Sequence, residues 1–192
     1  MRARDRGPLR IPLKNYLVVL LVAACAQAED VPWQVRYEPS PPQVVSAMLE
    51  LAAVSAKDVV YDLGCGDGRI VIEAAKRYGA RGVCVDIDPR RIAEARANAA
   101  EAGVAHRIRF REEDVLKTDL SDATVVTLFL SYDLNLALRP KLERELPAGT
   151  PVVSHWHRMG DWPVERTVYV DGPSRGNEVF LFRTRGSSRG IE

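Results

Sequence analysis

Apolar and polar positions alternate along the chain between short hydrophobic runs and longer amphipathic stretches. The hydrophobic runs predict strands, and the stretches between them have the apolar spacing of helices. The predicted strands are residues 58–63, 82–87, 107–111, 123–130 and 151–154. The predicted helices are residues 41–53, 69–78, 89–102 and 134–146, the last of them broken at Pro140. Two more strand-like runs, residues 166–170 and 178–183, flank a turn-rich segment and predict a closing hairpin.

This alternation predicts an α/β fold, because strands that alternate with helices form βαβ units and a parallel sheet with helices on both faces. The expected architecture is a doubly wound, Rossmann-like and mostly parallel sheet with an antiparallel C-terminal hairpin. Residues 29–57 form an entry arm and an N-terminal helix in this scheme, and residues 58–186 form the main domain.

Capping residues support the predicted helix ends. Gly79 and Gly103 follow the second and third helices, where a left-handed C-cap favours glycine. Asp88 precedes Pro89 and is a suitable N-cap for the third helix. Ser40 is expected to be the N-cap of the first helix, ahead of two prolines in its first turn.

The first 28 residues predict a leader rather than part of the fold. Residues 1–14 carry five basic side chains and one acidic one, and residues 16–26 form an unbroken apolar run. This run is shorter than the roughly 20 residues that span a bilayer and has the length of a signal-peptide core. Cleavage after Ala28, lipidation of Cys25 and an uncleaved anchor are alternatives. We expect an exported (periplasmic) protein, or one that is membrane-anchored through residues 15–28.

The overall composition limits the partners. The chain has a net charge of +1, 46% hydrophobic and 28% charged residues, as in soluble globular proteins. This near-neutral balance argues against a nucleic-acid partner. Outside the leader the cysteines are Cys65 and Cys84, too few for a disulfide scaffold. If the domain is exported, we therefore expect packing rather than bridges to hold it together. We also expect a monomer.

The most informative segment is a glycine loop that follows the first predicted strand. Gly64, Gly66 and Gly68 stand at alternate positions, so the spacing differs from the G-x-G-x-x-G of a dinucleotide loop. Glycine allows both a sharp turn and a close approach of a ligand to the main chain. Asp62 precedes the glycines and suits a cationic ligand, such as the α-amino group of an amino acid, better than a phosphate.

Acidic and apolar residues follow the next two strands. Asp86 ends the second strand, where a carboxylate can accept hydrogen bonds from both hydroxyls of a ribose. Asp114, after the third strand, could accept a hydrogen bond from an adenine amino group. Ile87 and Val115 could enclose the adenine ring. An amino acid, a ribose and an adenine along one sheet edge together indicate S-adenosylmethionine.

These segments resemble the class I S-adenosylmethionine-dependent methyltransferases. VVYDLGCGDGRI is similar to the first motif of that family, GVCVDIDP to the second and FREEDV to the third. The chain further resembles a branch that includes the lysine methyltransferases of ATP synthase c-subunit and adenine nucleotide translocase. The shared features are Tyr37-Glu-Pro39-Ser40, TVVTLFL, LRPKLERELPAGTPVVSH and the MGDW segment at 159–162. The resemblance covers residues 37–162 and implies that Tyr37 and Ser40 help to bind the cofactor and that the acceptor is a protein lysine.

The acceptor is expected over the fourth and fifth strands, because the cofactor takes the carboxyl ends of the first three. Tyr132, Asp133 and His155 follow or end those strands and are the candidate catalytic residues. Trp156 could line the lysine stem. The chain departs from its bacterial relatives at Ser131-Tyr132 and at Trp156-His157. A lysine ammonium must lose its proton before it can accept a methyl group, and desolvation would favour that loss.

Three other functions remain open from the sequence. They are a small-molecule methyltransferase, a nicotinamide-dependent oxidoreductase, which the glycine spacing disfavours, and a non-catalytic S-adenosylmethionine-binding module if the domain is exported. His155, His157 and Asp161 together fall short of a closed metal site, so no metal is expected.

Overall fold

The computed structural model describes residues 37–171 and 177–186. The predicted leader, its Cys25, most of the entry arm and the turn at 172–176 lie outside these residues. In chain order the elements are α1 Pro42–Leu51, β1 Val59–Leu63, α2 Arg69–Tyr78, β2 Arg81–Asp86, α3 Pro89–Glu101, η2 Ala105–Arg107, β3 Ile108–Glu112, β4 Val125–Leu128, α4 Tyr132–Glu145, β5 Pro151–His155, β6 Arg166–Tyr169 and β7 Glu178–Arg183.

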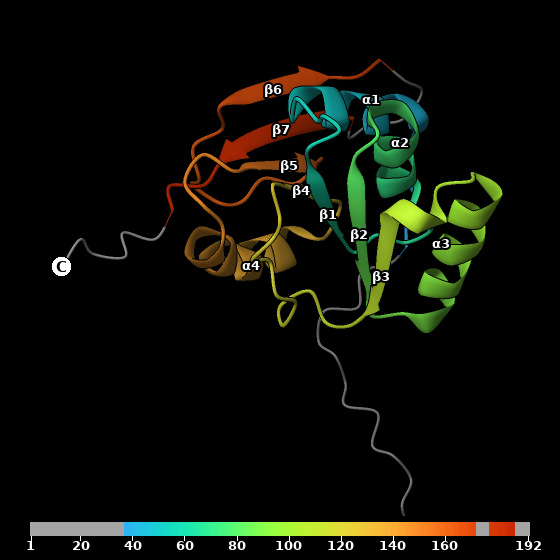
Figure 1. Cartoon of the computed structure of the whole chain (residues 1–192). Coiled ribbons are helices and arrows are strands. Elements are labelled where there is room, and N and C mark those ends of the chain that lie inside the picture. Colours follow the sequence, from blue (N-terminus) through green and yellow to red (C-terminus); the bar gives the residue numbers. More distant parts are fainter. Residues whose placement is uncertain (1–36, 172–176, 187–192) are drawn as a thin grey trace, which may run out of the picture. The chain divides into compact units, whose positions relative to one another are not determined.

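The strands form one seven-stranded sheet in the order β3-β2-β1-β4-β5-β7-β6 (Figure 1). The first five strands in this order are parallel, and β7 runs antiparallel to both β5 and β6. The predicted doubly wound sheet with an antiparallel end is confirmed. The strand order reverses between β1 and β4, and ligands of such sheets bind where the order reverses, at the carboxyl ends of the strands.

Helices cover both faces of the sheet. The β1 neighbours Val60 and Tyr61 point to opposite faces, and each joins a different buried cluster. The Val60 cluster includes α1 and α2, with α3 packed beside it against β2 and β3, whereas the Tyr61 cluster includes α4. Figure 1 accordingly shows α4 on the other side of the sheet from α1 and α2. This arrangement leaves the carboxyl edge of the strands for a functional site.

Several local expectations hold. Gly79 ends α2 in a left-handed conformation, and the side chain of Asp88 accepts the Arg90 amide at the start of α3. Within the described ranges, no helix has the length and apolar character needed to cross a bilayer.

Two predictions about helices are wrong. Pro41 rather than Ser40 precedes α1, and no side chain caps this helix, because the Ser40 hydroxyl is bonded elsewhere. Pro140 does not break α4, which continues through it. Leu138 and Leu142 are buried on either side of Pro140, and their packing holds the helix despite the backbone hydrogen bond that proline removes.

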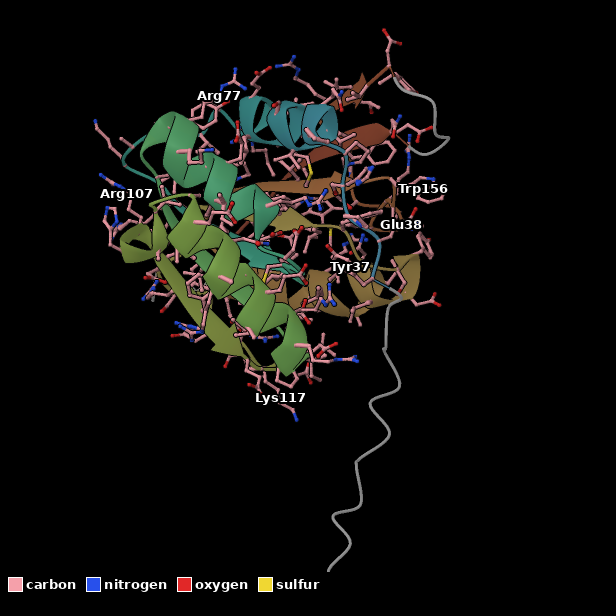
Figure 2. The ribbon with its side chains drawn as sticks, turned by 90° about the vertical axis from the view of Figure 1, so that its right-hand side faces the viewer. Tyr37, Glu38, Arg77, Arg107, Lys117 and Trp156 are labelled. Carbon is pink, nitrogen blue, oxygen red and sulfur yellow. A yellow bond between two sulfur atoms is a disulfide. The ribbon has the colours of Figure 1, made fainter. Side chains whose placement is uncertain are left out.

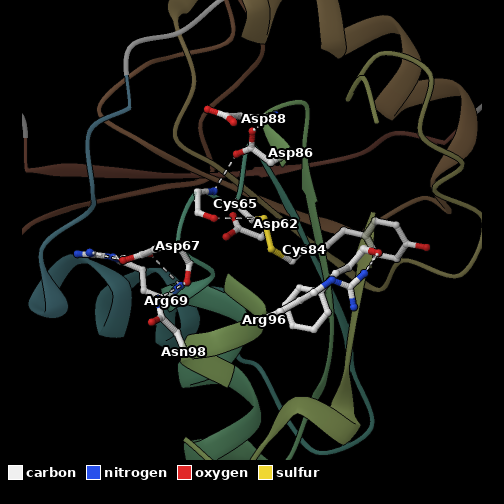
Figure 3. The surroundings of a disulfide bond; sticks show 12 residues. Asp62, Cys65, Asp67, Arg69, Cys84, Asp86, Asp88, Arg96 and Asn98 are labelled. Carbon is white, nitrogen blue, oxygen red and sulfur yellow. Dashed lines mark hydrogen bonds and ion pairs between the residues drawn. A yellow bond between two sulfur atoms is a disulfide. The ribbon is translucent and has the colours of Figure 1, made fainter. Parts of the chain in front are cut away.

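The expectation that no bridge stabilises the domain is also wrong. Cys65 and Cys84 form a disulfide, with their Cα atoms 5.3 Å apart (Figure 3). The amides of Gly64 and Cys65 both donate to the Val85 carbonyl, so the glycine loop folds back onto β2. This local fold brings the two sulfurs together.

Candidate active site

The glycine loop lies at the carboxyl end of β1 and is shaped by residues that leave no room for a side chain. Gly66 has a φ of +54°, and a Cβ atom placed on it would lie 2.5 Å from Cε2 of Tyr37. Gly64 and Gly68 also have positive φ values. A bare backbone at Gly66 therefore lets Tyr37 lie directly on the loop.

Asp86 fastens this loop to the end of β2. Its Oδ2 accepts the Gly66 amide at 2.9 Å, and its Oδ1 accepts the Asp88 amide at 3.0 Å. Each carboxylate oxygen has two lone pairs, so Asp86 retains acceptor capacity for further donors. The structure thus brings together Asp86 and Gly66, which were predicted separately as cofactor contacts.

Asp62 lies beneath the loop and is buried. Thr127 of β4 donates its hydroxyl to Asp62 Oδ1 at 2.8 Å. Burial and the nearby charges of Asp86 and Asp67 raise the pKa of Asp62 to about 7, against the lowering effect of the Thr127 hydrogen bond. A cation beside this carboxyl group would favour its charged form.

The third predicted cofactor segment lies at the ends of β2 and β3. Glu113 donates its amide to the Asp86 carbonyl at 3.1 Å, so the two strand ends adjoin. Asp114 begins a turn, with its side chain accepting the Leu116 amide. Ile87 is exposed whereas Val115 is buried. These four predicted residues, Asp86, Ile87, Asp114 and Val115, share one edge of the sheet.

The arm before α1 crosses the same edge from the glycine loop to β5. At one end the Arg91 guanidinium lies over the Tyr37 ring, 4.4 Å from its centroid. At the other end the Ser40 hydroxyl is 2.9 Å from His155 Nδ1, and the Ser40 carbonyl accepts a hydrogen bond from Arg69. Ser40 is therefore placed between the two predicted halves of the site.

The candidate catalytic residues lie at two depths. Tyr132 and Asp133 are exposed in the first turn of α4, where Ser131 is the N-cap and accepts the Leu134 amide. His155 ends β5 as predicted but is buried, with its ring 4.0 Å from that of Phe129. The exposed Tyr132 and Asp133 are thus accessible to an acceptor, whereas the buried His155 contacts the arm through Ser40.

Residues that the sequence reasoning missed fix the chain after β5. Asn135 Nδ2 donates to Ser154 Oγ and to the His157 carbonyl, and Ser154 Oγ donates to the same carbonyl. Asn135 occupies a polar position of an amphipathic stretch, which in sequence resembles a solvated helix face. No local signal distinguishes it from one.

The third member of the considered metal set is engaged elsewhere. Asp161 forms an ion pair with Arg139 of α4. Across residues 37–171 and 177–186, no three His, Cys, Asp or Glu side chains are grouped so that they could hold a metal ion.

A cavity of about 450 Å³ opens beside the start of α2. Its walls come from α1, α2 and α3 and include Asp67, Arg69 and Asn98, but none of the residues predicted to bind the cofactor. The Asn98 side chain donates to the Asp67 carbonyl within this wall. We therefore assign the site to the carboxyl edge and not to this cavity.

Known proteins resemble the chain over much of its length. Residues 62–166 match the model of the ANTKMT methyltransferase domain. A protein-lysine N-methyltransferase of Saccharolobus islandicus is 45% identical over 149 residues, which are 77% of this chain and 92% of that protein. The adenine nucleotide translocase lysine N-methyltransferase of Mus musculus is 35% identical over 66% of this chain and 53% of its own length.

A solved structure is similar over a comparable range. It is described as an RNA methyltransferase from Salinibacter ruber in complex with S-adenosyl-L-homocysteine, with 48% identity and a TM-score of 0.74. The match covers 81% of this chain and 98% of that one. The names of these relatives agree on methyl transfer and differ on the acceptor.

Proposed function

This chain belongs to the ANTKMT methyltransferase family, and we propose that it transfers methyl groups to the side-chain amine of protein lysines. It is an S-adenosylmethionine-dependent methyltransferase, as its relatives and the family model show. The acceptor is the part that we propose.

The residues at the edge fit the cofactor. Asp86 has free lone pairs for ribose hydroxyls beside the exposed backbone of Gly66. The buried Asp62 gains a counter-charge if an amino-acid ammonium approaches. S-adenosylmethionine supplies a methyl group on a sulfonium, which is already activated for transfer. The residues of the chain then have to bind and orient the two reactants and to exclude water from them.

The acceptor half of the edge suits an amine. It presents the aromatic rings of Tyr132 and Trp156 and the carboxylates of Asp133 and Glu38, all exposed. Aromatic faces pack on the alkyl stem of a lysine, and carboxylates attract its ammonium. This acidic and aromatic character is the observation that carries the proposal. The carboxylates attract the lysine ammonium, and the desolvation of the bound amine against the aromatic rings favours loss of its proton.

An RNA acceptor fits the same surface less well. Phosphates require basic side chains, and RNA binding is dominated by such contacts. The nearest arginine after β5, Arg158, lies over the Phe180 ring at 5.0 Å from its centroid. Glu38 and Asp133 would repel a phosphate backbone that approached Tyr132.

The test offers the full chain three kinds of acceptor with isotope-labelled S-adenosylmethionine. The acceptors are lysine-rich protein (poly-L-lysine and a histone mixture), total RNA, and a small-molecule extract. We expect the label in methyllysine after acid hydrolysis of the proteins, and less label with the Asp86→Ala variant. Label in RNA alone, or in small molecules alone, would contradict lysine methylation.

We also propose that the protein is exported or membrane-anchored through residues 15–28 and acts as a monomer. The basic leader with its short apolar core supports export. The Cys65–Cys84 disulfide supports it as well, because disulfides persist mainly in oxidising compartments. Mass spectrometry of the native N-terminus would test the proposed export or anchoring. A mature chain beginning at Glu29, or at a lipid-modified Cys25, is expected for export, and an intact Met1 on membrane-bound protein is expected for the anchor. An intact Met1 on soluble protein would contradict both.

A further inference from the structure

The backbone turns sharply at Trp156, directly after β5. Trp156 has a φ of +64°, and the His157 amide donates to the His155 carbonyl at 2.8 Å, which closes a γ-turn around it. This left-handed region is unfavourable for a bulky L-residue, and strained residues of this kind gather at functional sites.

The other non-glycine residue with a positive φ among those described is Ala53. It follows α1, and the next amide, that of Val54, donates to the Leu49 carbonyl. That bond belongs to an ordinary helix ending, in which a left-handed residue is common. Trp156 follows a strand and has no such local explanation.

Three elements hold the Trp156 turn. Trp156 donates its amide to the Glu178 carbonyl of β7 at 2.7 Å. The His157 carbonyl accepts from Ser154 of β5 at 2.6 Å and from Asn135 of α4 at 3.3 Å. The turn is therefore fixed by its surroundings.

Asn135 holds the Trp156 turn although one of its own buried polar atoms stays unpaired within the described part of the chain. Its side chain is 0% exposed, and among the described residues its Oδ1 atom has no hydrogen-bond partner. Buried polar atoms are nearly always paired, so an unpaired one asks for an explanation. The two donor bonds of Nδ2 to Ser154 and His157 supply one: the amide is retained to hold the turn.

The hydrogen bonds that hold the turn place the Trp156 ring outward at the carboxyl edge. Trp156 is 41% exposed, and its ring stacks on that of His157 with the centroids 5.3 Å apart. Every large hydrophobic residue that is exposed in the described ranges lies along this edge or just beyond it: Tyr37, Ile87, Tyr132, Trp156 and Tyr169. Figure 2 shows Trp156, Glu38 and Tyr37 on the same side, away from Arg77 and Arg107.

The charge beside the turn is negative. Glu38 of the arm is close enough to raise the pKa of His157, while burial lowers that pKa to below its usual value. His157 is consequently neutral near pH 7 and does not repel a cation. No ion pair occupies Glu38 within the part of the chain that the structure describes.

We infer that the Trp156 turn is the specificity-determining element for the acceptor: the Trp156 ring receives the alkyl stem of the target lysine, Glu38 faces its ammonium, and Asn135 is the positioning residue that holds the turn. This inference rests on the proposed lysine methylation.

The test compares two glycine variants in steady-state kinetics with poly-L-lysine. Trp156→Gly removes the ring and relieves the positive φ, whereas Ala53→Gly relieves the other positive φ away from the edge. We expect Trp156→Gly to raise the KM for poly-L-lysine about tenfold, the loss of the apolar contact with the lysine stem, with an unchanged Kd for S-adenosylhomocysteine and no loss of thermal stability. Ala53→Gly should leave the KM unchanged. Trp156→Phe, which keeps an aromatic ring, should have a KM much closer to that of wild type than Trp156→Gly has. An unchanged KM in Trp156→Gly, or an equal rise in both glycine variants, overturns the inference.

A double-mutant cycle tests the role of Asn135. Asn135→Leu should raise the same KM in the wild-type background and add nothing to Trp156→Gly, because it acts through that ring. Ser154→Ala, which removes the other bond to the His157 carbonyl, should behave alike. Additive effects would overturn the positioning role. If wild-type protein forms no methyllysine on poly-L-lysine or histones, the proposed function itself fails, which is a different result from an active wild type with an unaffected Trp156→Gly.

Discussion

The hydroxyl of Ser40 lies 2.9 Å from Nδ1 of His155, although 115 residues separate them in the chain. This contact joins the arm that carries Tyr37 to the end of β5. Since Tyr37 lies on the glycine loop, the arm connects the cofactor half of the edge with the acceptor half.

Ser40→Ala should loosen this connection. The variant leaves a buried imidazole nitrogen without the hydroxyl, a loss of about 1–3 kcal/mol in the free energy of unfolding. We also expect weaker S-adenosylhomocysteine binding in calorimetry, because Tyr37 loses its anchor. Ser46→Ala, one turn into α1, is the matched control and should change neither the free energy of unfolding nor the binding of S-adenosylhomocysteine. A similar loss in both variants would contradict the role of the contact between Ser40 and His155.

Removing the disulfide should destabilise the domain. The bridge closes a sequence separation of 19 residues, for which chain entropy predicts about 3 kcal/mol. We expect reductant to lower the denaturation midpoint of wild-type protein. The Cys65→Ala/Cys84→Ala variant should already have the lower midpoint and should not respond to reductant. A midpoint of wild-type protein that reductant leaves unchanged would show that the bridge contributes nothing.

The raised pKa of Asp62 predicts a pH dependence of stability. Burial raises this pKa from 3.8 to about 7, so the folded chain binds more protons than the unfolded chain between these values. The contribution of Asp62 to the free energy of unfolding therefore falls as the pH rises through that window. Denaturation curves of Asp62→Asn should lack this fall. Thr127→Val removes the hydroxyl that donates a hydrogen bond to Asp62 and should extend the fall to higher pH. Identical pH profiles of Asp62→Asn and wild type would contradict the assignment.

Gly66→Ala should displace Tyr37 from the loop. The new Cβ would lie 2.5 Å from the Tyr37 ring, and the positive φ adds backbone strain. We expect lower stability and weaker cofactor binding, both measured by calorimetry. In the Tyr37→Ala background the steric part disappears, so Gly66→Ala should cost less there than in wild type; equal costs in both backgrounds would contradict the contact.

Local chemistry made much of this fold predictable. The alternation of strands and helices, the glycine at the end of α2 and the Asp88 cap all depend on neighbours in the sequence, and the structure confirms them. The bond of Ser40 to His155 and the bridge of Cys65 depend on how distant segments meet, which propensity does not report.

The candidate site shows the same division. Asp86 could be expected from its place after a strand, but its bond to the Gly66 amide could not. The turn at Trp156 was not predictable, because three separate elements impose a conformation that tryptophan disfavours on its own.

The most direct test of the account is whether the two halves of the edge can be separated. Affinity for S-adenosylhomocysteine and the rate of methyllysine formation would be measured for Asp86→Ala and Tyr132→Ala. We predict that Asp86→Ala raises the Kd about tenfold or more, the loss of hydrogen bonds to a charged group. Tyr132→Ala should slow methyllysine formation and leave the Kd unchanged. A Kd that rises equally in both variants, or a rate unaffected by Tyr132→Ala, would contradict the division into a cofactor half and an acceptor half.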